Sequence, residues 1–264
     1  MQSVKHDEIR QAVRENYGAV ARSDAACGCG PACCTPTGLP GADILSRGIG
    51  YSESEVGAVP EGANLGLGCG NPQAIAALKP GETVLDLGSG AGFDCFLAAR
   101  QVGDSGQVIG VDMTPDMVSK ARANAAKGGY ANTGFRLGEI EHLPVANATV
   151  DAIISNCVIN LSPDKAQVFR DAFRVLKSGG RLAISDIVAT AELPEEARRD
   201  LALYTGCMAG ASLIGELEAM MQSAGFDQVR ITPKDESRAF IRDWAPGSKI
   251  EEFVVSANIV AVKP

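Results

Sequence analysis

A regular alternation of strand-like and helix-like segments, which begins near residue 80, constrains the fold of this chain more than any other feature. The expected strands are residues 82–88, 106–113, 134–140, 150–155 and 181–188, and the expected helices are residues 92–101, 114–127 and 163–176. Short apolar runs mark the strands, and Thr114 followed by Pro115 supplies a helix cap and a first helical residue. This alternation predicts an α/β fold in which a mostly parallel sheet is covered by helices on both faces.

The segments on either side of this alternation have a different character. Residues 4–21 have the period of an amphipathic helix, whereas residues 23–72 lose periodicity and become rich in Gly, Pro, Ser and Cys. A long stretch of this kind is typical of a functional lid or of a disordered segment, and its four cysteines within eight positions favour the lid. A helical region near 193–224 and two late strands, 228–233 and 258–264, follow the alternating part. They bring the expected sheet to seven strands and predict a small C-terminal α+β appendage.

Composition limits the classes of partner. The net charge of −8 argues against a nucleic-acid partner, because proteins that bind the phosphate backbone gather Lys and Arg on one face. No apolar run approaches the ~18–20 residues of a membrane span. The N-terminal residues also lack the apolar region of a secretory signal. We therefore expect a cytoplasmic, monomeric protein that acts on a small molecule and binds neither nucleic acid nor membranes.

A glycine-rich turn, "VLDLGSGAGFD" at 84–94, follows the first expected strand. Its glycines allow positive φ and close approach of the backbone to a ligand. The spacing is G-x-G-x-G, because Phe93 stands where the dinucleotide fingerprint has its third glycine. Asp112 ends the next strand, where its carboxylate can accept hydrogen bonds from both hydroxyls of a ribose. The turn alone is compatible with any nucleotide-binding fold of this type.

The turn, Asp86 before it and Asp112 after the next strand together resemble the class I S-adenosylmethionine-dependent methyltransferases over roughly residues 80–190. The resemblance implies a Rossmann-like fold and S-adenosylmethionine as methyl donor. It places Asp86 and the turn near the methionine part, Asp112 on the ribose, and Met113, Ile140 and Glu141 near the adenine. Ordinary packing at strand ends is the alternative for Met113 and Ile140. The expected donor-binding residues are Asp86, Gly88, Ser89, Gly90, Asp112, Met113, Ile140, Glu141 and Asn156.

The chain has eight cysteines, and without an export signal a disulfide scaffold is a poor explanation for them. Metal or metalloid binding, redox work and catalysis are the remaining options. Cys157 follows the strand 150–155, at the edge of the sheet where α/β proteins bind their ligands. A soft sulfur is therefore expected near the methyl donor, and thiolates suit thiophilic acceptors such as trivalent arsenic. Cys95, inside the helix 92–101, is expected to belong to the core.

Three cysteine motifs resemble those of the arsenite methyltransferases: "LGLGCGNP" at 65–72, "SNCVINLSPDK" at 155–165 and "YTGCMAGA" at 204–211. The C-terminal residues 240–264 are also similar, so the resemblance covers almost the whole chain. It implies that Cys157 and Cys207 hold arsenic and that Cys69 is a mobile third thiol. Either Cys33 or Cys34 matches the family's N-terminal cysteine. Cys27 and Cys29 are additional to the minimal cysteine pattern of the family. Zinc binding is an alternative role for this N-terminal cluster.

The resemblance therefore implies an enzyme that methylates thiol-bound As(III), with an external thiol reductant such as glutathione or thioredoxin. The implied parts are a helix and Cys/Gly-rich lid (1–72), a donor-binding core (73–190), and an arsenic-binding helical region with the last strands (191–264). Two alternatives are a C- or O-methyltransferase that acts on an organic small molecule and a thiol-rich metalloid-binding protein without turnover.

Overall fold

The computed structural model of the chain describes residues 2–23 and 41–264. The N-terminal cysteines Cys27, Cys29, Cys33 and Cys34 lie outside the described residues, so their predicted roles stay predictions.

Seven strands form one sheet in the order β3-β2-β1-β4-β5-β7-β6. Their bounds are β1 Thr83–Leu87, β2 Gln107–Asp112, β3 Thr133–Leu137, β4 Val150–Asn156, β5 Leu176–Ala189, β6 Asp227–Lys234 and β7 Val254–Val262. The strands β1 to β5 run parallel to one another, and β7 runs antiparallel to both β5 and β6. The predicted mostly parallel, seven-stranded Rossmann-like sheet is confirmed, and its last two strands come from the C-terminal part of the chain.

Three strand ends differ from the prediction by three residues or more, and one of them is the start of β5, which begins at Leu176 instead of residue 181. Strand β3 stops at Leu137, because the chain then turns back and Pro144 packs against Gly138, where a side-chain Cβ would lie 2.7 Å from the proline ring. Ile140 and Glu141 therefore lie in the loop after β3. Strand β7 begins at Val254, earlier than expected, because its first residues pair with the end of β5.

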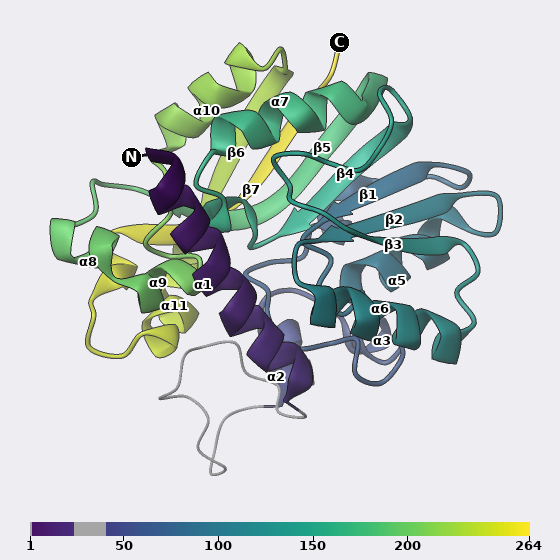
Figure 1. Ribbon diagram of the computed structural model, residues 1–264, viewed down its shortest axis with the longest axis horizontal. Helices are drawn as coiled ribbons and strands as arrows, with labels where there is room; N and C mark the ends of the chain where they lie inside the picture. The colour runs from purple at the N-terminus through teal and green to yellow at the C-terminus, as the bar shows by residue number, and fades with distance from the viewer. Residues whose placement is uncertain (1, 24–40) are drawn as a thin grey trace.

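Helices cover both faces of the sheet (Figure 1). The α-helices are α1 Gln2–Arg22, α2 Ala42–Gly48, α3 Glu53–Val56, α4 Gln73–Ala76, α5 Phe93–Val102, α6 Pro115–Gly128, α7 Lys165–Val175, α8 Glu195–Arg199, α9 Leu201–Thr205, α10 Ile214–Ser223 and α11 Arg238–Trp244. The 3₁₀ turns are η1 Ile159–Leu161, η2 Asp235–Ser237 and η3 Ile250–Glu252. Phe169 of α7 and Met221 of α10 pack on one face, and Phe96 of α5 packs on the other. Burial of each such side chain contributes roughly 1.5–3 kcal/mol to folding.

Helix α1 lies across the molecule and contacts α6, α9 and η1 (Figure 1). It thereby joins the side of the molecule that carries the glycine-rich turn to the side that carries Cys207. The Tyr17 hydroxyl donates to the Thr205 carbonyl oxygen at 3.2 Å, and Arg22 forms an ion pair with Asp116 of α6. None of the described helices is both long enough and apolar enough to cross a bilayer.

Candidate active site

A cavity at the carboxyl ends of β1, β2 and β4 is lined by every residue that the sequence predicts to bind the donor. Helix α1 adds Arg10, Val13 and Tyr17 to its wall, and Cys157 is also part of the lining. The carboxyl ends of parallel strands meet at one edge of a sheet, which is why residues distant in sequence share this cavity.

The glycine-rich turn is shaped for close approach. Gly88 has φ 68°, and a Cβ there would lie 2.4 Å from the Val158 side chain, so no larger residue fits. The Gly90 amide donates to the Asp112 carboxylate at 3.0 Å, which ties the turn to the end of β2. The buried Ser89 hydroxyl has no hydrogen-bond partner among the described residues. A polar ligand in the cavity can satisfy this group, so the residues present fit an adenosyl donor with polar substituents.

Three of the carboxylates that line the cavity, those of Asp86, Asp94 and Asp112, have raised pKa values. Burial is the main cause for each, and the pKa of Asp94 rises to about 6. The neighbouring Asp94 raises the pKa of Asp86 further, whereas the amides of Thr114 and Gly90 offset part of the rise at Asp112. Carboxylates gathered around one cavity stabilise a cation there, such as a sulfonium or an ammonium group.

Asp94 and Tyr51 are further site residues, which were not predicted from the sequence. The Tyr51 hydroxyl donates to the Asp94 carboxylate at 2.7 Å, and both side chains line the cavity. Asp94 lies at the start of the helix that follows the glycine-rich turn, and this place in the sequence could have indicated it. Tyr51 lies in the aperiodic region 23–72, where no pattern indicated which side chains face the site.

Cys95 is fully buried, as predicted for a core residue. Its sulfur lies 3.2 Å from the Asp86 carboxylate, to which the thiol donates. The contact lowers the pKa of Asp86 in part, although burial outweighs it. Cys95 is thus a core thiol that also supports a carboxylate of the cavity wall.

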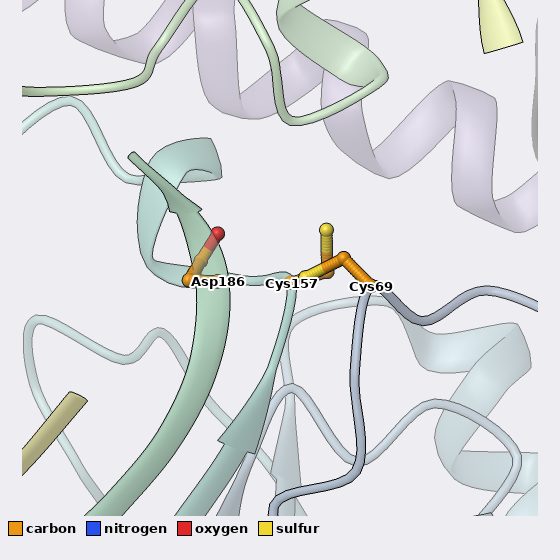
Figure 2. Close-up of side chains that lie close together, drawn as sticks. All are labelled: Cys69, Cys157 and Asp186. Atoms are coloured by element: carbon orange, nitrogen blue, oxygen red, sulfur yellow. The ribbon is translucent and has the colours of Figure 1, made fainter. Parts of the chain in front are cut away.

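Three other thiols, those of Cys69, Cys157 and Cys207, come together beside the cavity, and each is buried and free. The sulfurs of Cys69 and Cys157 and a carboxylate oxygen of Asp186 all lie within 4.8 Å of one another. Figure 2 shows these three side chains converging from the loop before α4, the end of β4 and strand β5. The Cys207 thiol donates to the Cys157 carbonyl oxygen at 2.7 Å. The structure therefore brings together all three described cysteines that the sequence assigned to arsenic.

The thiols of Cys157 and Cys69 are held in their neutral form. Hydrogen bonds with the Cys207 and Cys69 thiols, followed by burial, raise the pKa of Cys157 well above its usual range. Burial also raises the pKa of Cys69. Binding of a thiophilic ion here must therefore release protons, which couples affinity to pH.

Asn156 connects the cavity to the loop that carries Cys69. Its side-chain oxygen accepts from the Cys69 amide at 3.0 Å, and its amide nitrogen donates to the Gly70 carbonyl oxygen at 2.8 Å and to the Tyr51 hydroxyl at 3.0 Å. The same side chain lines the cavity. The position of Cys69 is thus linked to the wall of the donor cavity.

Helix α1 supplies further site residues that the sequence did not reveal. The Arg10 guanidinium pairs with Glu141 at 3.0 Å, and the Ser162 hydroxyl donates to the same carboxylate at 2.8 Å. The Tyr17 hydroxyl lies 3.8 Å from the Cys207 sulfur, and burial raises the pKa of Tyr17 well above its usual range. The amphipathic pattern of residues 4–21 predicted a buried face of this helix but not what that face covers.

Comparison with known proteins agrees with this arrangement. A family model described as a methyltransferase domain matches residues 78–225. The arsenite methyltransferase of Halobacterium salinarum is 54% identical over 98% of this chain and 67% of its own length. That of Aquipseudomonas alcaligenes is 39% identical over 84% of this chain, and the match covers 63% of the relative, which is less than two thirds.

A solved structure also matches over most of the chain. The arsenic(III) S-adenosylmethionine methyltransferase of Chlamydomonas reinhardtii superposes with a TM-score of 0.63 at 32% identity, covering 86% of this chain and 75% of that one. The glycine-rich turn, Cys157 and Cys207 lie within the residues 78–225 that the family model matches. This chain belongs to the arsenite methyltransferase family, within the class I S-adenosylmethionine-dependent methyltransferases.

Proposed function

We propose that this chain transfers a methyl group from S-adenosylmethionine to trivalent arsenic held by its own thiols. One observation carries the proposal: Cys157 lines the donor cavity, and its neighbours outside the cavity are the thiols Cys69 and Cys207. A soft three-thiol cluster at the wall of a methyl-donor cavity suits As(III), which binds sulfur and keeps a lone pair. Relatives that carry the name arsenite methyltransferase support the same substrate.

The donor would supply an electrophilic methyl group on a sulfonium sulfur. In this proposal Asp112 accepts from the ribose hydroxyls, while Asp86 and the turn Gly88, Ser89 and Gly90 receive the methionine part. The remaining lining residues assigned to the donor are Met113, Ile140, Glu141 and Asn156. The arrangement lets the chain fix the orientation of the methyl group and exclude water from it.

Arsenic is the second substrate. Cys157 and Cys207 displace its hydroxide or thiol ligands, the sulfur-bound protons leave, and Cys69 is the third thiol. The As(III) lone pair forms the As–CH₃ bond while the S–CH₃ bond of the donor breaks, with S-adenosylhomocysteine as leaving group. The lone pair needs no deprotonation, so the step requires orientation rather than a general base.

Methylation takes the lone pair of arsenic and formally yields As(V), so two electrons must return before As(III) is regenerated. Two thiolates can supply them by forming a disulfide. Cys69 and Cys157 are the proposed pair, because their sulfurs are close in the structure. An external thiol, glutathione or thioredoxin, would reduce that disulfide, and Cys33 or Cys34 would pass the oxidation outward.

The predicted monomeric state and cytoplasmic location remain proposals, as does the division at residues 72 and 190 into a lid, a donor-binding core and an arsenic-binding part.

Incubation of the protein with donor, arsenite and a thiol, followed by chromatography with arsenic-specific detection, tests the function. We expect methylated arsenic to accumulate together with S-adenosylhomocysteine. Bound arsenic without a methylated product would instead indicate a metalloid-binding protein. Donor consumption that requires an organic acceptor and ignores arsenite would indicate a C- or O-methyltransferase.

A further inference from the structure

Cys157 and Cys207 share a backbone conformation that residues with a side chain rarely adopt. Their φ angles are 59° and 63°, in the left-handed region. Glycine adopts this region freely, and Asn or Asp can offset its cost through local hydrogen bonds, but a cysteine side chain does neither. Strain of this kind persists only where neighbouring groups hold the backbone in place. The question is which side chains hold these two residues.

Asp186 holds the chain that follows Cys157. One of its carboxylate oxygens accepts from the amides of Val158 at 3.1 Å and Ile159 at 2.8 Å. The other oxygen accepts from the Ile187 amide at 2.7 Å and from the Asn160 side chain at 3.0 Å. Asp186 is 1% exposed, so these bonds are shielded from water. Its carboxylate thus fixes the turn that places the Cys157 side chain.

Asn160 extends this hold to Cys207. Its side-chain nitrogen has three acceptors: the Asp186 carboxylate at 3.0 Å, the Ile187 carbonyl oxygen at 2.6 Å and the Cys207 carbonyl oxygen at 3.2 Å. Because all three neighbouring atoms accept hydrogen bonds, the side-chain nitrogen of Asn160, and not its oxygen, must face them. A single buried side chain therefore connects the backbone of Cys207 to the carboxylate that positions Cys157.

Packing around Asn160 leaves the Cys207 segment little freedom. A Cβ on Gly210 would lie 2.1 Å from the Asn160 carbonyl oxygen, so only glycine permits this approach. Lys165 donates to the Gly210 carbonyl oxygen at 2.7 Å. The Cys207 thiol also bonds to the Cys157 carbonyl oxygen. These contacts fix the two cysteines relative to each other.

We propose that Asp186 and Asn160 are positioning residues that set the spacing of the Cys157 and Cys207 thiols before arsenic binds. The inference rests on the proposed function and names the groups that prepare its substrate site. A prearranged dithiol loses less conformational freedom on binding, which strengthens affinity.

The closeness of Asp186 to the sulfurs of Cys69 and Cys157 would also fit a direct ligand role (Figure 2). However, each of its oxygens already accepts two hydrogen bonds. A carboxylate engaged in this way is a poor ligand, so Asp186 acts through the backbone and through Asn160.

The decisive variant is Asn160→Ala, compared with Asn132→Ala as a matched control. Asn132 donates to two carbonyl oxygens, those of Ala99 and Gly103, both at 3.1 Å, at the amino end of β3. We expect Asn160→Ala to weaken arsenite binding and to raise the arsenite KM by about tenfold or more. The Kd for S-adenosylmethionine should change less than about twofold. Asn132→Ala should leave the arsenite KM and the Kd for S-adenosylmethionine unchanged, although it should lower thermal stability about as much as Asn160→Ala does.

Asn160→Ser keeps a hydrogen-bond donor on a shorter side chain, so it should show an intermediate loss of arsenite affinity. This variant replaces Asn160→Ala in the test if Asn160→Ala does not fold. Wild-type arsenite affinity in the Asn160 variants, or the same loss in Asn132→Ala, would overturn the positioning role even if the wild type methylates arsenic. A wild type that binds arsenite more tightly than Asn160→Ala yet yields no methylated product would support the positioning role and reject the proposed function. A wild type that does not bind arsenite would overturn both.

Discussion

At the scale of single residues, the surroundings of a cysteine determine its role more than its burial does. Cys95 and Cys157 are both buried. The sulfur of Cys95 contacts the Asp86 carboxylate, whereas the sulfur of Cys157 lies near that of Cys69 at the wall of the donor cavity. Only the second arrangement offers a thiophilic ion more than one sulfur ligand.

This contrast predicts different effects of the same substitution. Cys157→Ser should abolish arsenite methylation, because a hard, neutral hydroxyl replaces a soft ligand. Cys95→Ser should keep activity, since a hydroxyl can still donate to Asp86, and should change the free energy of unfolding by about 1 kcal/mol. Rates of arsenite methylation and urea unfolding of both variants give the comparison. Equal methylation rates in the wild type and both variants would remove Cys157 from the site.

The sequence predicted those site residues that belong to a local motif. The glycine-rich turn, Asp112 and the three separate cysteine motifs could each be read from adjacent letters, and the structure brings them to one place. Asp186 and Asn160 could not be found in this way, because their role depends on hydrogen bonds with segments distant in sequence. Tyr17 was missed for the same reason, since its contact with Cys207 follows only from the folded chain.

At the scale of elements, the loop before α4 is the segment that links the thiol cluster to the donor cavity. Its amide at Cys69 and its carbonyl at Gly70 bond to the side chain of Asn156, while the Cys69 sulfur lies near that of Cys157. The Ser256 hydroxyl also donates to the Cys69 carbonyl oxygen at 2.7 Å. The proposed relay requires this loop to exchange these hydrogen bonds, so that Cys69 reaches arsenic in one state and Cys157 in another.

This arrangement predicts that turnover stops after about one methylation per enzyme when no external thiol is present, because the electrons that reduce arsenic come from the protein. Mass spectrometry of the stalled enzyme should show a disulfide that includes Cys69, and Cys157 is the expected partner. Addition of glutathione or thioredoxin should restart turnover. Repeated turnover without any reductant, or a stalled enzyme with all thiols free, would contradict the relay.

Regular elements were predictable wherever periodicity was strong. The helix over 4–21 and the alternating strands and helices appear in the expected order, as α1 and β1 to β5 with their connecting helices, although β3 ends earlier and β5 begins earlier than predicted. The short helices α2, α3 and α4 were not predicted, because each is only about one or two turns long and owes its stability to tertiary packing. Val56 of α3 and Ala76 of α4 are buried in this way.

At the scale of the whole molecule, buried carboxylates control how stability depends on pH. Burial raises the pKa of Asp94 and of Asp186 from 3.8 to about 6. In the folded protein these groups keep their protons over a pH range in which the unfolded chain has lost them. Their contribution to stability is therefore full below about pH 4 and is lost as the pH rises through about 6. The loss is on the order of 2–3 kcal/mol for each group.

Other carboxylates have the opposite effect on stability: they make the folded protein less stable as the pH falls. Hydrogen bonds and ion pairs lower the pKa of Glu82 and Asp151, so the stability that these groups contribute is present above about pH 4 and is lost on further acidification. Both groups are partly exposed, so solvent screens their contributions. The ligand-free protein should consequently be most stable on the acidic side of neutrality.

The methyl donor should reverse this dependence. Its sulfonium is a cation, and Asp86, Asp94 and Asp112 around the cavity stabilise a cation only when ionised. We expect the stability of the ligand-free protein to fall between about pH 4 and 7, while the stabilisation by S-adenosylmethionine grows over the same range. Urea unfolding with and without donor across this range measures both trends. S-adenosylhomocysteine, which has no sulfonium charge, is the control and should show a smaller dependence. If ligand-free stability instead rises steadily with pH, or if both ligands stabilise with the same pH profile, the buried carboxylates do not have this electrostatic role.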